Sequence, residues 1–181
     1  MIWFTADSHH GHSNIIKYTS RPYTCAEHMD RQLILNWNSV VGEHETIYHL
    51  GDFCLGGEKE ADAIINQLNG RIHVLYNPQH HDRRWIPPCL DSLHRYTSRS
   101  GYKVKFELPQ LTLEIPEYGD RQALVLSHWP MLKWDRSHYG SFHVFGHCHG
   151  MLKHPGKAID VGVDCNNYTP VSLEEVARRL G

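Results

Sequence analysis

Five short clusters of histidine and aspartate are spaced along the chain, and each follows a run of apolar residues with the composition of a β-strand. Carboxylate oxygens and imidazole nitrogens are common ligands of divalent metal ions. In α/β sheets, ligands bind beyond the carboxyl ends of the strands, so clusters far apart in the sequence can form one site there. The pattern therefore predicts a metal site at a sheet edge. The clusters are Asp7-Ser8-His9, Gly51-Asp52, His80-His81-Asp82, His128 and Gly146-His147-Cys148-His149.

The spacing within the clusters suits two neighbouring ions. Asp7 and His9 are two residues apart and can reach one ion together. The two oxygens of Asp52 can reach two ions, and His147 and His149 in an extended segment can direct both rings toward neighbouring metals. These oxygen and nitrogen donors, without a thiolate motif, favour two divalent ions about 3.5–4 Å apart, as in hydrolytic sites, over a structural zinc.

The length and composition of the chain limit the classes of protein to which it can belong. The chain has 181 residues, about the length of one domain, so we expect a single domain over residues 1–181. A net charge of −2 gives no general basic field for coating nucleic acid. The five cysteines are scattered without a C-x-x-C pair, and no stretch is typical of a signal peptide or membrane span, so we expect a cytoplasmic protein that does not contact a membrane.

Hydrophobic periodicity predicts the elements that position these clusters. Apolar residues recur at helical spacing from residue 26 to 41 and from 58 to 68, and Ser172 with Glu175 forms a capping box that opens a last helix to Leu180. Runs rich in β-branched and aromatic residues predict eight strands. These strands cover residues 2–6, 46–50, 71–76, 102–106, 111–115, 122–126, 142–145 and 158–163.

The order of these elements indicates an α/β fold. Strands and helices alternate in the first half, which predicts parallel strands joined by crossovers. The second half consists mostly of strands, with a turn at Gly119-Asp120, which predicts hairpins. A mixed α/β sandwich accounts for both halves.

The ordered motifs resemble those of the calcineurin-like metallophosphoesterase superfamily, in particular its small bacterial and phage members. The series D-x-H, G-D, an N-H-D-like element, H and G-H-x-H spans Asp7 to His149 and so covers most of the chain. Further similarity lies in TADSHHGH at residues 5–12, WN at 37–38, YHLGDF at 48–53 and YTPVS at 168–172.

The resemblance implies a four-layer αββα sandwich of two mixed β-sheets flanked by helices, with two divalent ions (Mn, Fe, Zn or Ni) at its edge. The first ion would be held by Asp7, His9 and His149, and Asp52 would bridge the pair. The second would be held by His128 and His147.

The third motif departs from the family pattern G-N-H-D or G-N-H-E, because residues 76–82 read YNPQHHD. In one interpretation His80 takes the place of the asparagine ligand, which would favour zinc, nickel or iron over manganese and magnesium. In a second interpretation Asn77 remains the ligand and the residues after it are an insertion. In a third, the catalytic geometry is lost.

The resemblance also implies the chemistry. A water activated by the ions would attack a phosphate ester, and His81, oriented by Asp82, would donate a proton to the leaving oxygen. We expect a phosphodiesterase for small phosphate esters or nucleotides. The alternatives are a non-catalytic scaffold that binds phosphate or a partner, and a metal-dependent nuclease, which the charge balance does not favour. Oligomeric state is left open.

Side chains close to these motifs are candidates for substrate binding. Charge-assisted hydrogen bonds from them could hold a phosphate, and exposed aromatic side chains could stack on a nucleobase. The phosphate candidates are His12, Asn14, Arg21, Arg83 and Arg84, and the aromatic candidates are Trp129, Trp134 and Tyr139.

Overall fold

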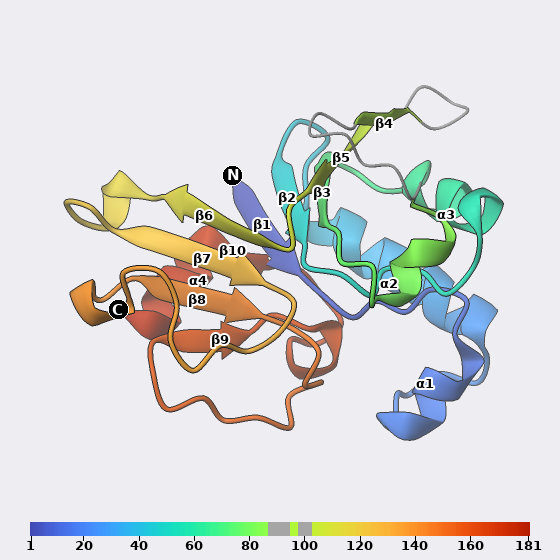
Figure 1. The fold of residues 1–181 in the computed structure, drawn as a ribbon. Helices are drawn as coiled ribbons and strands as arrows, with labels where there is room; N and C mark the ends of the chain where they lie inside the picture. Colours follow the sequence, from blue (N-terminus) through green and yellow to red (C-terminus); the bar gives the residue numbers. More distant parts are fainter. Residues whose placement is uncertain (87–94, 98–102) are drawn as a thin grey trace.

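The chain folds into two β-sheets that face each other, with helices on the outer side of the larger sheet (Figure 1). The structure, a computed structural model, describes residues 1–86, 95–97 and 103–181. The first sheet has the strand order β10-β1-β2-β3-β5-β4 and the second has the order β6-β7-β8-β9. The strands are β1 (Ile2–Thr5), β2 (Thr46–His49), β3 (Arg71–Leu75), β4 (Arg95–Thr97), β5 (Lys103–Glu107), β6 (Gln110–Glu114), β7 (Ala123–Ser127), β8 (Phe142–Phe145), β9 (Ala158–Asp160) and β10 (Val171–Ser172).

Two helices cover the outer face of the six-stranded sheet. Trp37 on α2 and Ile65 on α3 are buried in one cluster with Ile47 on β2 and Ile72 on β3. The helical spacing of apolar residues provides this buried stripe, as the sequence predicted. The helices are α1 (Ser13–Tyr18), α2 (Ala26–Val40), α3 (Glu58–Ile65) and α4 (Leu173–Leu180).

The main core lies between the two sheets. Phe4 and Leu75 from the first sheet pack with Leu124 and Val144 from the second, and α4 adds Val176 to the same cluster. Because side chains alternate along a strand, the other face of β2 and β3 remains for the helices. This packing fixes the relative position of the strand ends that carry the predicted metal ligands.

The parallel arrangement predicted for the first half is confirmed. Strand β1 pairs in parallel with β2, and β2 pairs in parallel with β3, while α2 and α3 provide the crossovers. The sequence did not predict α1, β4 or β10, and the last two of these belong to the same six-stranded sheet. Strand β5 is observed over Lys103–Glu107. We expected it to begin at Tyr102, which lies outside the described residues. Cys89 also lies outside them.

The prediction of hairpins in the second half is wrong for the last strands of the four-stranded sheet. In this sheet β6 and β7 are antiparallel and joined through the predicted turn at Gly119, whereas β7 with β8 and β8 with β9 are parallel. Parallel neighbours need a long crossover, and residues 128–141 and 146–157 supply it without forming an α-helix. These two connections cover the outer face of the sheet, where Trp134 and His154 pack near His143.

The last helix begins as the capping box predicted, with one difference. The Ser172 hydroxyl accepts the backbone N–H of Glu175 at 3.1 Å. The Glu175 carboxylate binds Arg178 and Arg179 instead of the backbone of Ser172. Among the residues that the structure describes, no helix is long and apolar enough to cross a lipid bilayer.

Candidate functional site

The strand ends of the two sheets meet at one place, and their loops are hydrogen-bonded to each other there. The backbone N–H of Asp7 donates to the carbonyl of Gly51 at 3.1 Å, and that of His9 donates to Asp52 at 2.9 Å. Across the gap between the sheets, the backbone N–H of His147 donates to the Asp7 carboxylate at 2.8 Å. The loops after β1, β2 and β8 are therefore held together by these bonds.

All seven predicted metal ligands lie in this meeting point. Four overlapping groups have ligand atoms that all lie within 4.8 Å of one another, which is close enough to share an ion. Asp52 belongs to three of the four groups, as expected for a residue between two sites. The groups are Asp7 with His9 and His149, His9 with Asp52 and His81, Asp52 with His128 and His147, and Asp52 with His80 and Asp82.

Distances within the site fit ligands better than hydrogen-bond partners. The Asp52 Oδ2 atom lies 3.6 Å from Nε2 of His128 and 3.8 Å from Nε2 of His9, and Oδ1 of Asp7 lies 4.0 Å from Nδ1 of His128. These separations exceed those of a good hydrogen bond. Two atoms that each lie about 2.0–2.2 Å from one ion are separated by roughly 3–4 Å, which matches the observed distances.

Several buried polar atoms of the site have no hydrogen-bond partner. Both ring nitrogens of His9, His80 and His128 are buried and unpartnered, as is Oδ1 of Asp7. A buried polar atom without a partner is rare in folded proteins and costs stability. Divalent cations would bind one nitrogen of each of these rings and the oxygen of Asp7, so the residues present fit the metal that the sequence predicts.

Several of the predicted ligands also have a strained backbone conformation. Five of the ten non-glycine residues with positive φ in the described chain are predicted ligands. Such conformations cost roughly 1–3 kcal/mol each and are found mainly at functional sites. The five are Asp7 (φ 59°), His9 (52°), Asp52 (56°), His147 (67°) and His149 (48°).

The structure distinguishes between the two candidate ligands in the third motif. The His80 imidazole is buried beside His128, with ring centroids 4.0 Å apart. A Cβ atom on Gly51, whose φ is +120°, would lie 2.4 Å from Nδ1 of His80, so the ring occupies space that only glycine leaves free. The Asn77 side-chain oxygen instead accepts the backbone N–H of Gln79 at 3.0 Å. The geometry therefore favours His80 over Asn77.

His81 lies at the side of the site that His12 borders. Its ring centroid is 5.5 Å from that of His9 and 5.6 Å from that of His12. The His81 backbone N–H donates to Oδ1 of Asp52 at 3.1 Å, which fixes the start of the short helix η1 (His81–Arg84) against the site. Its imidazole is half-buried.

The expected role of Asp82 needs correction. Its buried carboxylate accepts the backbone N–H groups of Phe53 and Cys54 and the indole N–H of Trp85, at 2.8–3.2 Å. Among the described residues none of its hydrogen bonds goes to His81, so Asp82 does not orient that ring. Burial raises the pKa of Asp82 to about 6, against the effect of these three donors. Asp82 holds the loop after β2 in place.

Arg21 is also not available for the substrate. It is 4% exposed, and its guanidinium makes a bidentate pair with Asp164 at 2.8 Å and donates to the carbonyls of Asp7 and Ser8. Asp164 in turn accepts Nδ1–H of His149 at 2.7 Å, which leaves Nε2 of that ring free. Carboxylate–histidine pairs of this kind orient metal-binding histidines in proteins. Sequence reasoning missed Asp164, which lies fifteen residues from its histidine.

Burial keeps most of the site's histidines neutral. It lowers the pKa of His80 to about 4, and burial together with the neighbouring imidazoles lowers the pKa of His128 to about 2. The neutral ring is the form that binds a metal. Burial acts in the same direction on His149, but the hydrogen bond to Asp164 and the charge of Asp7 raise its pKa overall. Burial also raises the pKa of Asp7, which a cation would counteract.

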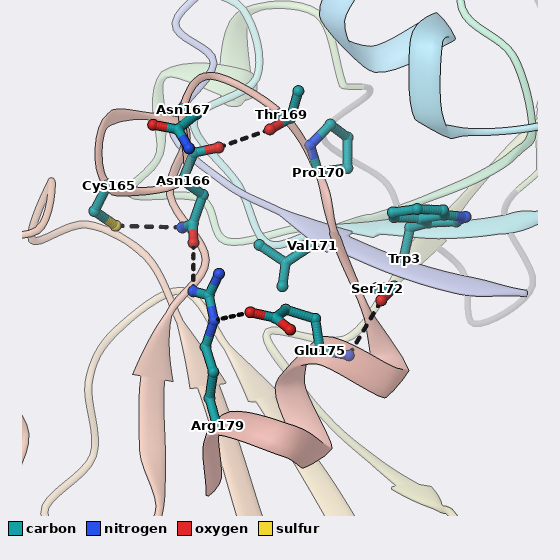
Figure 2. A pocket seen from close by; sticks show the side chains of 10 residues that line it. All are labelled: Trp3, Cys165, Asn166, Asn167, Thr169, Pro170, Val171, Ser172, Glu175 and Arg179. Atoms are coloured by element: carbon teal, nitrogen blue, oxygen red, sulfur yellow. Dashed lines mark hydrogen bonds and ion pairs between the residues drawn. The ribbon is translucent and has the colours of Figure 1, made fainter.

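The segment that carries Asp164 is braced from the other side by the C-terminal helix. Arg179 of α4 lines a pocket of about 220 Å³ there. It donates to the side-chain oxygen of Asn166 at 2.9 Å and to the carboxylate of Glu175 at 2.6 Å, and Figure 2 marks both contacts with dashed lines. Asn166 also donates to the carbonyls of Asp160 and Gly162. The side chains of Arg179, Asn166 and Glu175 bind each other or the backbone in this pocket, so we interpret it as structural support for the site.

The remaining phosphate candidates are at the surface. His12 caps the N-terminus of α1, where its Nδ1 accepts the backbone N–H of Ile15 at 3.1 Å, and its ring lies against His9 and His81. Asn14 is exposed on α1. Arg83 and Arg84 are exposed on η1, and Arg84 donates to the carbonyl of Leu55 at 3.3 Å. His12 is thus closest to the metal ligands among these candidates.

Comparison with known proteins gives relatives without a stated function. No family model matches the chain. The chain is 29% identical over 188 residues to the uncharacterized protein MJ1445 of Methanocaldococcus jannaschii, which covers 99% of this chain and 90% of that protein. It is 26% identical over 182 residues to the gene 66 protein of Mycobacterium phage L5, which covers 90% of this chain and 86% of that protein.

One solved structure has the same fold. It is a protein of unknown function, AQ665, from Aquifex aeolicus, with a TM-score of 0.69. The similarity covers 99% of this chain and 98% of that chain at 20% sequence identity. At this identity the comparison shows the fold and leaves the chemistry to be argued from the site.

Proposed function

We propose that this chain is a metal-dependent phosphoesterase of the metallophosphoesterase type, acting on phosphodiesters among small phosphate esters or nucleotides. One observation carries the proposal. The unpartnered ring nitrogens of His9, His80 and His128 are buried around the carboxylates of Asp7 and Asp52, where five separate strand ends meet. A cluster of buried nitrogen and oxygen atoms without hydrogen-bond partners is best explained by cations that bind these atoms.

The groups in the site suggest how two ions would be shared. Asp7, His9 and His149 would hold one ion, and His80, His128 and His147 the other, with Asp52 between them. The ions would supply Lewis acidity, which lowers the pKa of a water toward neutrality and offsets charge on the phosphoryl oxygens. The second set is rich in nitrogen donors, which favours zinc, nickel or iron over manganese and magnesium.

The chain's own residues supply the proton transfer. When the oxygen of water bonds to phosphorus, the bond from phosphorus to the leaving oxygen breaks, and His81 would donate a proton to that oxygen. The His81 ring would then regain a proton that the attacking water loses, so that His81 is protonated again for the next turnover. His12 borders the same side of the site and would hydrogen-bond a phosphoryl oxygen, with Arg83 as a more distant cation.

The fold is consistent with this assignment. In the metallophosphoesterase-type sandwich each sheet has an outer helical layer. Helices α2 and α3 supply one such layer on the six-stranded sheet. Helix α4 packs against β1, β9 and β10 and contributes to the core between the sheets, so in our proposal the connections 128–141 and 146–157 form the fourth layer, on the outer face of the four-stranded sheet.

A reconstitution assay tests the function. Protein stripped with chelator would be loaded in parallel with manganese, iron(II), zinc or nickel, and its metal content measured along with hydrolysis of bis(p-nitrophenyl) phosphate and p-nitrophenyl phosphate. We expect two ions per chain and faster turnover of the diester. The variant Asp52→Asn should lose both ions together and all turnover. Two bound ions with turnover of neither ester would contradict the proposal and favour a non-catalytic scaffold.

A further inference from the structure

A second cavity lies between the two long connections that cover the outer face of the four-stranded sheet. These connections, residues 128–141 and 146–157, begin with predicted metal ligands and continue away from them. The cavity has a volume of about 440 Å³. Its lining contains none of the residues in the metal-ligand groups. The lining residues are Leu132, Lys133, Trp134, Ser137, His138, Gly156 and Lys157.

The walls of this cavity are fixed by hydrogen bonds. The backbone N–H of Met131 donates to Nε2 of His143 at 3.2 Å, and its carbonyl lies 3.1 Å from Nε2 of His154, which ties one connection to the other. The indole N–H of Trp134 donates to Ser141 at 3.0 Å. The position of the Trp134 ring is therefore set before any ligand binds, which lowers the entropy cost of binding.

The charged groups that line the cavity are all cationic. Lys133 and Lys157 are exposed there, and no lining residue is acidic. In the stretch 129–157 four Lys and Arg residues outweigh one Asp, although the whole chain has a net charge of −2. Arg136 is paired with Glu114 at 2.8 Å, but within the described part of the chain Lys133 has no ion pair. The charge of the cavity suits an anionic ligand.

The same surface also offers apolar and aromatic groups. Leu132, which lines the cavity, is 81% exposed, and so is Tyr139, which follows the lining residue His138. The rings of His138 and Tyr139 lie 4.1 Å apart. Exposed aromatic rings next to lysines are a combination that binds the bases and the backbone of single-stranded nucleic acid. An inorganic anion or a simple acid would leave these apolar groups unused.

We propose that this cavity binds a nucleotide unit, with its phosphate between Lys133 and Lys157 and its base against Trp134 and Leu132. The unit would be a free nucleotide or part of a single strand. Resting on the proposed function, this inference names nucleotides as the substrate class, because the connections that form the cavity also carry His128 and His147. Binding of the phosphate depends on the positive charge of these two lysines, so the net charge of −2 on the whole chain does not oppose it.

Binding can be measured without turnover. Fluorescence anisotropy of a labelled twelve-residue oligothymidylate would be followed in EDTA over a range of salt concentrations. We expect the double variant Lys133→Glu, Lys157→Glu to lose more than tenfold in affinity. Each phosphate contact to single-stranded nucleic acid contributes about 0.7 to the slope of log K against log salt, so the slope should fall by roughly 1.4. Lys59→Glu, at an exposed lysine on α3, is the matched control and should bind like wild type.

Two further ligands decide what is recognised. An oligonucleotide of the same length without bases should bind at least tenfold more weakly, and equal binding would overturn the role of the bases. Binding of adenosine monophosphate, followed by calorimetry, would assign the site to free nucleotides, whereas binding of the strand alone would assign it to single-stranded nucleic acid. The single variant Lys133→Glu repeats the test if the double variant fails to fold. Equal affinity of folded variant and wild type would overturn the proposal.

The outcome separates this inference from the proposed function. Oligonucleotide binding that depends on Lys133 and Lys157, with no hydrolysis of either chromogenic ester, would support the cavity and contradict the phosphoesterase. Ester hydrolysis without measurable binding of the oligonucleotide or the mononucleotide would contradict the cavity and leave the phosphoesterase intact.

Discussion

At the scale of single residues, the candidate metal ligands are recognised by buried polar atoms that have no hydrogen-bond partner. The ring nitrogens of His80 and His128 are buried and without partners, whereas the carboxylate of Asp82 is bound by three donors. Residue type alone does not reveal this difference, since both histidine and aspartate can bind a metal. The hydrogen-bond partners separate the candidate ligands from the residues that support them.

The identity of the ligand in the third motif gives the first prediction. His80→Asn replaces a nitrogen donor with an oxygen donor, so zinc affinity should fall by more than about tenfold while manganese affinity changes less. Competition with a chromogenic chelator measures both. Asn77→Ala is the matched control, because its side chain caps a turn, and should keep zinc affinity within about threefold of wild type. Loss of zinc in Asn77→Ala with retention in His80→Asn would reverse the assignment.

The second prediction concerns His81. If its ring donates a proton to the leaving oxygen, His81→Ala should lower kcat for the diester by about 10²- to 10⁴-fold and leave two ions bound. Metal analysis and steady-state kinetics on the same sample are sufficient. An equal loss of metal and activity would instead make His81 a ligand, in the group that it forms with His9 and Asp52.

At the scale of elements, the site depends on short turns that direct ligands from the strand ends. The turn η4 (Val163–Cys165) places Asp164 against Nδ1 of His149, and the C-terminal helix braces the residues that follow through Arg179 and Asn166. These contacts explain how a ligand with a strained backbone, at φ 48°, keeps its orientation.

Asp164→Asn tests this turn. An amide at this position would present N–H to His149 and favour the tautomer with its proton on Nε2, the nitrogen that a metal would bind. We expect affinity for one of the two ions to fall by about 10- to 100-fold, measured by calorimetric titration. Asp135→Asn, in an exposed connection, is the control. Unchanged affinity for both ions would show that Asp164 does not orient the ligand.

His143 links β8 to its neighbours and makes stability depend on pH. Its Nδ1 bonds the Val125 carbonyl at 2.9 Å and its Nε2 accepts the Met131 N–H, so the neutral ring fits both. Burial lowers its pKa from 6.5 to about 4. Between these values the unfolded chain binds more protons than the folded one, so the free energy of unfolding should decrease as pH falls, by up to about 3 kcal/mol.

Denaturant titrations at pH 7, 5.5 and 4.5 measure this effect. His143→Asn should be less stable at pH 7 and should lose less stability than wild type as pH falls. His138→Asn, on an exposed residue, should follow wild type. A parallel decline of His143→Asn and wild type would exclude His143 as a source of the pH dependence.

The sequence predicted helices and strands well where apolar residues repeat at the period of the element and so mark its buried face. Helix α2 and the parallel strands β1 to β3 are examples, because their apolar residues repeat at the period of the element. It failed for β7 to β9, since strand direction there is set by connections that have no periodicity of their own. In the site, the positions of ligand-type residues were predictable, but the inward direction of Arg21 and the partner of His149 depend on tertiary packing.

At the scale of the whole molecule, the two sheets contribute different halves of one site. The six-stranded sheet supplies Asp7, His9, Asp52 and His80, and the four-stranded sheet supplies the other three predicted ligands. The core between the sheets therefore sets the distance between the two halves. An archaeal and a phage relative extend over most of this chain, so both sheets fall within the shared length.

The central claim is that these halves hold two divalent ions, and anomalous diffraction tests it most directly. Crystals of zinc-loaded protein would be measured on both sides of the zinc absorption edge. We predict two anomalous peaks about 3.5–4 Å apart, one among Asp7, His9 and His149 and one among His80, His128 and His147, with Asp52 between them. A map with no peak at these residues, or with a single ion bound elsewhere on the chain, would contradict the account.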